Sequence, residues 1–218
     1  MSTKYPVWDF PTRLFHWLIA IGVGLSWWSG ELGEFTYHAW VGYMILVLVC
    51  WRIMWGFVGS QHSRFADFLR GPKGVWDYLR GTEDSPVGHN PAGGWSVAVL
   101  LLLLLVQSFS GLFNSDDLIF DGPFYFAASV GFRDFMGVVH EYAFYALQGF
   151  ILLHIAAVVY YQWIKKMPIV QAMIYGKAAS RVGQSGPAPL WWALVIVVLA
   201  GGTLWWAVSL APKPQLMW

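Results

Sequence analysis

Five long apolar segments constrain what this chain can fold into. They are separated by Gly, Pro and charged residues, and none shows the alternating pattern of a membrane barrel strand. In a hydrocarbon layer about 30 Å thick, only a helix or a closed barrel satisfies the backbone hydrogen bonds. We therefore predict membrane-spanning helices at Leu14–Ser29, Ala39–Val58, Trp95–Phe113, Phe135–Trp163 and Leu190–Leu210.

The composition agrees with a polytopic membrane protein in contact with lipid. Hydrophobic residues make up 57% of the 218 residues and charged residues only 11%. The mean hydropathy of +0.52 lies on the apolar side of an ordinary soluble domain. The net charge is only +1, and the basic residues are spread among the loops. We therefore expect no nucleic-acid partner.

The single cysteine, Cys50, excludes several kinds of redox centre. One cysteine can form neither an intrachain disulfide nor the Cys-x-x-Cys-His attachment of a covalent haem, and it cannot hold an iron–sulfur cluster alone. Cys50 lies within an apolar run, where we expect a small buried side chain. Any haem in this chain must therefore be bound without a covalent link.

Two histidines lie within the fourth apolar segment, fourteen residues apart at His140 and His154. In a helix this spacing corresponds to about 21 Å along the axis, with a rotation roughly 40° short of four turns. Both imidazoles therefore project from nearly one face, one toward each leaflet. A polar side chain at such a depth is costly unless it has a partner or a function.

A hydrogen bond to a neighbouring helix is the simpler interpretation of either histidine taken alone. The pair favours iron porphyrin, which needs an axial ligand on each side of its plane. Two further histidines lie near the ends of predicted helices, His16 in the first and His38 at the start of the second. His62 and His89 fall in the polar linker between the second and third segments, where we expect solvated loop histidines.

The distribution of Lys and Arg predicts the topology. Eleven of the thirteen basic residues fall on one side of the five predicted spans, which places the N-terminus in the cytoplasm and the C-terminus outside. His16 and His154 then lie near the cytoplasmic face, and His38 and His140 near the outer face. Two facing pairs at two depths fit two bis-histidine haems. Zinc is disfavoured, since a structural zinc site takes four ligands.

Several short motifs carry a family resemblance over about residues 5 to 180. They are Arg13–Trp17, His38 with Gly42, Arg52–Trp55, His62–Phe65, Gly88–Pro91, and the helix of His140 and His154 leading to Met173–Lys177. As an ordered set, they resemble the bacterial cytochrome b561 superfamily, specifically the b-type cytochrome subunits of nickel–iron hydrogenases. The resemblance implies an all-α membrane bundle, with a four-helix haem-binding domain at 1–180. The remainder, 181–218, forms a fifth, C-terminal transmembrane helix.

The same resemblance implies two non-covalent haems b, with iron ligands at His16, His38, His140 and His154. Arg13 and Arg52 are candidate partners of haem propionates, because a guanidinium can bind a carboxylate through two hydrogen bonds. Snorkelling to the membrane interface is the alternative for both arginines. No catalytic residue is implied.

The expected function is electron transfer across the bacterial inner membrane, between the quinone pool and a periplasmic partner. That partner is either a hydrogenase or a c-type cytochrome, since the fifth helix departs from the hydrogenase-subunit pattern. A stand-alone quinone-linked oxidoreductase of the respiratory chain is an alternative. A proton-coupled transporter is disfavoured by the scarcity of intramembrane Asp and Glu. A purely structural anchor leaves the four histidines unexplained.

Overall fold

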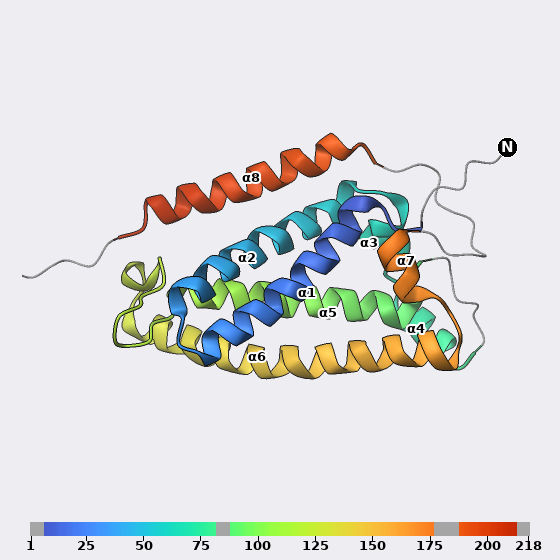
Figure 1. Cartoon of the computed structure of the whole chain (residues 1–218), viewed down its shortest axis with the longest axis horizontal. Helices are drawn as coiled ribbons and strands as arrows, with labels where there is room; N and C mark the ends of the chain where they lie inside the picture. The colour runs from blue at the N-terminus through green and yellow to red at the C-terminus, as the bar shows by residue number, and fades with distance from the viewer. Residues whose placement is uncertain (1–6, 82–87, 177–187, 213–218) are drawn as a thin grey trace, which may run out of the picture.

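The fold is a helical bundle, seen in a computed structural model that describes residues 7–81, 88–176 and 188–212 (Figure 1). Its long helices are α1 (Phe10–Glu31), α2 (Phe35–Val58), α5 (Pro91–Ser110), α6 (Val130–Val159) and α8 (Leu190–Ser209). The shorter elements are η1 (Gln61–Ser63), α3 (Phe65–Phe68), α4 (Pro72–Leu79), η2 (Gly111–Phe113), η3 (Tyr125–Ala127), η4 (Tyr160–Ile164) and α7 (Ile169–Tyr175). The described residues form no strand, only one isolated bridge between Ser115 and Asp121.

Helices α1 and α2 form an antiparallel hairpin. The α1 helix begins where Asp9 accepts a hydrogen bond from the main-chain N–H of Thr12 at 2.9 Å, with Pro11 in its first turn. The chain reverses after Glu31 through Gly33, whose φ of +71° favours glycine. The N-terminal end of α1 therefore lies beside the C-terminal end of α2.

Helices α5 and α6 complete a four-helix core. Asn90 caps α5 by accepting a hydrogen bond from the Gly93 N–H at 2.6 Å. The α6 helix is 30 residues long and continues through a π-helical turn at Tyr160–Ile164. Buried aliphatic side chains of α2, α5 and α6 form the centre of the bundle, namely Ile45, Val49, Leu101, Leu104 and Leu147.

Helix α8 packs along α2 at the side of this core (Figure 1). Ile196 is buried against Trp51 and Trp55, and the indole N–H of Trp51 donates to the main-chain oxygen of Ala193 at 3.0 Å. The expected four-helix core with a fifth helix is therefore confirmed.

Four of the described helices are long and apolar enough to cross a membrane: Phe35–Val58, Pro91–Phe113, Val130–Ile164 and Leu190–Ser209. The α1 helix is not among them. Its 22 residues span about 33 Å, so it has the length but not the apolarity, chiefly because Arg13, His16 and Glu31 lower its mean hydropathy. The membrane span expected at Leu14–Ser29 from its apolar run is therefore not among these four and stays a prediction, while α1 itself packs along α2.

The two ends of the bundle differ. The segment between α2 and α5 folds over one end as η1, α3 and α4, joined there by α7, and we call this the α4 end (Figure 1). The opposite end, called the α1–α2 end, carries the hairpin turn and the loop between α5 and α6. Four residues of the charge count, Lys4, Lys177, Arg181 and Lys213, lie outside the described residues.

Candidate functional site

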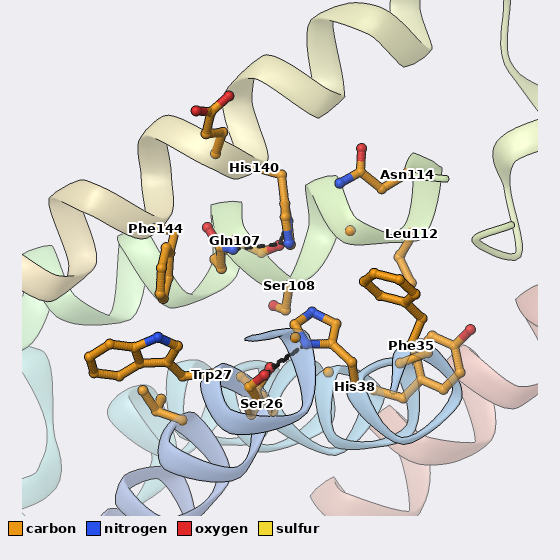
Figure 2. Close-up of a pocket in the computed structure, with 18 of the residues that line it drawn as sticks. Ser26, Trp27, Phe35, His38, Gln107, Ser108, Leu112, Asn114, His140 and Phe144 are labelled. Carbon is orange, nitrogen blue, oxygen red and sulfur yellow. Dashed lines mark hydrogen bonds between the residues drawn. The ribbon is translucent and has the colours of Figure 1, made fainter. Parts of the chain in front are cut away.

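His38 and His140 face one another at the α1–α2 end of the bundle. His38 lies in the first turn of α2 and His140 on α6, and their ring centres are 6.2 Å apart with the planes inclined at 73°. Figure 2 shows the two side chains reaching toward each other from opposite helices. The structure thus brings together the two residues that the sequence places near the outer face.

Main-chain carbonyls of the two other core helices orient these rings. Nδ1 of His38 donates to the oxygen of Ser26 on α1 at 2.8 Å, and Nδ1 of His140 donates to the oxygen of Gln107 on α5 at 2.9 Å. A carbonyl oxygen only accepts, so each Nδ1 carries the hydrogen. Each Nε2 keeps its lone pair, which is the form that binds a metal, and the carbonyl raises its basicity.

A cavity of about 490 Å³ surrounds this pair. Its walls are mainly apolar, and glycines lie against the rings: a Cβ at Gly30 would lie 3.2 Å from Nδ1 of His38, and one at Gly111 would lie 3.0 Å from Cε1 of His140. At Gly42, another wall residue, a Cβ would meet nothing within 4 Å. The site has the size and lining of a small-molecule or cofactor pocket.

The side chain of Gln107 also enters this cavity. Its amide nitrogen donates to Nε2 of His140 at 3.1 Å, while its Oε1 is buried and has no partner among the described residues. The amide therefore caps the nitrogen that a metal would use, and it must turn away before His140 can bind one. The sequence places Gln107 near the end of the third segment without indicating this role.

His16 and His154 form a second pair, toward the α4 end. Their ring centres are 6.4 Å apart and their planes are inclined at 50°. His16 comes from α1 and His154 from α6, and Nδ1 of His16 is buried without a partner among the described residues. Because His140 and His154 are separated by fourteen residues of one helix, the two pairs lie at levels about 21 Å apart.

Both separations fit one metal ion between two imidazoles. A metal binds an imidazole nitrogen at about 2 Å, and the ring centre lies about 1 Å behind that nitrogen, so two opposing rings have centres about 6 Å apart. The described residues contain no group of three or more His, Cys, Asp and Glu suited to a metal. Each level offers two histidines, which suits an iron porphyrin because the porphyrin itself supplies four ligands to the iron.

The two candidate arginines lie at the α4 end. Arg52 is only 2% exposed, stacks over the Phe65 ring at 5.4 Å, and has an Nη1 without a partner in the described chain. Arg13 donates from Nη1 to the main-chain oxygen of Ile174 at 2.6 Å, and its Nε is buried and unpaired among the described residues. Burial argues against snorkelling for Arg52.

A buried carboxylate, Asp9, lies at the same end and was not singled out by sequence reasoning. Besides capping α1, it accepts hydrogen bonds from the Trp55 indole at 3.1 Å and from the Ser63 hydroxyl at 3.3 Å. It also attracts the charge of Arg52. Its hydrogen-bond partners lie on three elements, so Asp9 links α1, α2 and η1.

The prediction that His89 is a solvated loop histidine is wrong. Its ring centre lies 4.6 Å from those of both Trp8 and Phe68, and its Nδ1 is buried. Burial, and after it repulsion by Arg52, His62 and His154, lowers the pKa of His89 to about 3. The imidazole is therefore neutral. His62 is half-buried, and burial lowers its pKa as well, with Asp67 opposing the shift.

The fold is that of a multi-pass membrane helical bundle, with two pairs of histidines that face each other across its core. The family model described as prokaryotic cytochrome b561 matches residues 7–176. The chain belongs to this family, whose members are membrane b-type cytochromes that bind haem b and transfer electrons. Comparison with curated proteins and with solved structures gives no match.

Proposed function

We propose that this protein binds two haems b and carries electrons between the two faces of the bacterial inner membrane. The observation that carries the proposal is the pair of matched separations, 6.2 Å for His38 and His140 and 6.4 Å for His16 and His154. His16 and His154 would hold the iron of one haem, and His38 and His140 that of the other. When bound, each haem supplies a one-electron ferric/ferrous couple.

The protein's own residues would fix and insulate these haems. Main-chain carbonyls hold the imidazoles of His38 and His140 in the metal-binding form. Arg13 and Arg52 would bind propionates at the other level, which is supported by their buried, unpaired nitrogens. A guanidinium left unpaired in the interior is costly, and a carboxylate would satisfy it.

The orientation of the protein follows from its basic residues. The α4 end carries Arg64, Arg70, Lys73 and Arg80, so it would face the cytoplasm, with the α1–α2 end facing outward. The N-terminus would then be cytoplasmic and the C-terminus periplasmic, with α1 crossing as a fifth span. We also propose a haem-binding domain at 1–180 and a separate C-terminal transmembrane helix at 181–218, since the family match ends at 176.

Quinone or quinol is the proposed redox partner within the membrane, and a periplasmic hydrogenase or c-type cytochrome is the partner outside. The proposal of these two partners rests on the resemblance to hydrogenase cytochrome subunits. It also agrees with the proposed orientation, in which the His38 level lies toward the outer face, where electrons are exchanged with a soluble protein. A stand-alone quinone-linked oxidoreductase would use the same two levels.

Proteoliposomes provide a direct test of the electron path. With ferricyanide trapped inside and dithionite added outside, the protein should reduce the trapped ferricyanide faster than protein-free vesicles do. His16→Ala and His38→Ala should each abolish that excess, because either change interrupts one level. Reduction no faster than in protein-free vesicles, by haem-loaded wild type, would contradict the proposal. A quinol analogue in place of dithionite tests the quinone assignment separately.

A further inference from the structure

His89 is held in a fixed position where three segments meet. Its neighbour Asn90 caps α5, which fixes the backbone, and its ring lies between Trp8, just before α1, and Phe68, at the end of α3. The start of α5 is itself packed closely on α3, since a Cβ at Gly94 would lie 2.8 Å from the Phe68 oxygen. The imidazole is therefore part of the α4 end and not of a free linker.

The buried face of His89 lacks a partner. Its Nδ1 is buried and has none among the described residues, while the residue as a whole is half-buried. Buried side-chain nitrogens almost always have a hydrogen-bond partner in folded proteins. The same end of the bundle also leaves Arg52 Nη1 unpaired. Nδ1 of His89, in the segment before α5, and Nη1 of Arg52, on α2, are thus two buried nitrogens at one end of the bundle without a partner among the described residues.

The charges around His89 are positive or neutral. Arg52, His62 and His154 all act on it by repulsion, and no carboxylate is among the groups that act on it. Asp9, the nearby acid, is already engaged by Thr12, Trp55 and Ser63. Nη1 of Arg52 only donates, so the partner that it lacks is a hydrogen-bond acceptor, most favourably an anion. With the ring hydrogen on Nδ1, His89 can donate to the same acceptor.

We infer that His89 and Arg52 together bind a propionate of the haem held by His16 and His154. His89 donates from Nδ1 as a neutral imidazole, and Arg52 supplies the positive charge. His89 and Arg52 lie at the α4 end, toward which the pair of His16 and His154 also lies, so the two nitrogens are nearer the level of that haem than the level of His140. The inference rests on the proposed haem at His16 and His154, and it adds His89 as a positioning residue.

Haem with esterified propionates separates this role from a structural one. Apoprotein is loaded with haem b or with haem b dimethyl ester, and haem release to an excess of a soluble haem-scavenging apoprotein is followed optically. The variants are His89→Phe, which fills the space without a donor, and His89→Gln, which keeps an N–H. His62→Phe, a change of the neighbouring half-buried imidazole, serves as the matched control.

With haem b, we expect His89→Phe to release one of the two haems about tenfold faster, because one charge-assisted hydrogen bond is lost. His89→Gln and His62→Phe should stay near wild type. With the dimethyl ester, wild type and His89→Phe should release that haem equally fast. The potential of the same haem should fall in His89→Phe with haem b only, since its carboxylate loses a donor.

Two results would overturn the inference. One is release of haem b from His89→Phe at the wild-type rate. The other is a faster release that persists with the ester, which would mean that His89 acts through packing. In both cases the low-spin spectrum of two bound haems would still be present, so the proposed function would stand. Failure of that function appears differently, as absence of the haem at His16 and His154 in wild type.

Discussion

His38 and His140 face each other at 6.2 Å, and each is aimed by a carbonyl from a helix that carries neither of them. Ser26 of α1 orients His38 of α2, and Gln107 of α5 orients His140 of α6. All four core helices therefore meet at this level. Because the orienting groups are main-chain atoms, substitution of Ser26 or Gln107 leaves them in place, and the ligands themselves are the sensitive positions.

The first prediction concerns which histidines share a haem. His16→Ala and His154→Ala should perturb the same component of a redox titration, and His38→Ala and His140→Ala should perturb the other. The reason is that ligands of one iron must lie at one level, and the two levels are about 21 Å apart. Potentiometric titration of the four variants checks this. Loss of one common component in His16→Ala and His38→Ala would rule out the two-level arrangement.

The second prediction concerns the side chain of Gln107, whose amide caps Nε2 of His140 at 3.1 Å. Gln107→Leu removes this competitor while keeping the carbonyl that orients His140. We expect the apoprotein to take up haem at this level several-fold faster, as measured by absorbance after mixing with haem in detergent. Ser108→Ala is the control, because Ser108 lines the same cavity and bonds only to main-chain oxygens of α5. Equal uptake rates for Gln107→Leu and wild type would show that the cap has no kinetic effect.

The third prediction is an order of redox potentials. The cavity at the His38 level is lined by Glu31, Asp116 and Glu141 and by no Lys or Arg, whereas the other level has Arg13 and Arg52. Negative charge stabilises the oxidised iron, so the haem at His38 should have the lower potential. Glu141→Gln should raise that potential by roughly tens of millivolts, a modest change because Glu141 is exposed.

Spectroelectrochemistry of Glu141→Gln beside wild type measures this shift. Arg52→Gln provides the opposite change, since it should lower the potential of the other haem and leave the first one unaltered. A potential at the His38 level above that at the His16 level would mean that these charges do not set the order.

The fourth prediction concerns the loop after η2, which carries the exposed side chains of Leu118 and Ile119. Oδ1 of Asp116 accepts the N–H groups of Leu118, Ile119 and Phe120 at 2.8–3.0 Å. These bonds, the one from Phe120 foremost, hold the pKa of Asp116 below its usual range. A depressed pKa stabilises the folded loop above the usual carboxyl pKa of about 3.9, and this stabilisation is lost as the pH falls through the lower folded value.

Asp116→Ala should therefore open the loop at neutral pH, whereas Asp116→Asn keeps an acceptor oxygen and should resemble wild type. Chymotrypsin cleavage at Leu118 and Phe120, followed by mass spectrometry, reports the opening. Equal cleavage of Asp116→Ala and wild type would show that other contacts hold the loop.

The sequence was sufficient for the fold class, the family and the approach of the histidines in space. The lengths of the apolar segments and the fourteen-residue spacing predict which histidines meet, and the structure brings those pairs together. The membrane orientation from the charge count stays a prediction. The predicted helix ends were less accurate. The α6 helix begins at Val130 instead of Phe135, because it extends N-terminally beyond its apolar part. The role of the four histidines as iron ligands stays a prediction.

Residues that are buried by distant segments of the chain could not be recognised as buried from the sequence. Asp9 has partners 46 and 54 positions away, at Trp55 and Ser63. His89 lies in a stretch that is polar by composition, and only the approach of Trp8 and Phe68 buries it. No local pattern contains these contacts, since they arise when the segment between α2 and α5 folds over the end of the bundle.

The haem stoichiometry tests the central claim most directly. A pyridine haemochrome assay on purified protein, set against amino-acid analysis, should give two haems b per chain, all extractable by acidified organic solvent because no thioether can form. The variants His16→Ala and His140→Ala should each give one haem b per chain. A wild-type protein with a single haem would mean that one of the two histidine pairs holds no iron, and a protein without haem would contradict the account altogether.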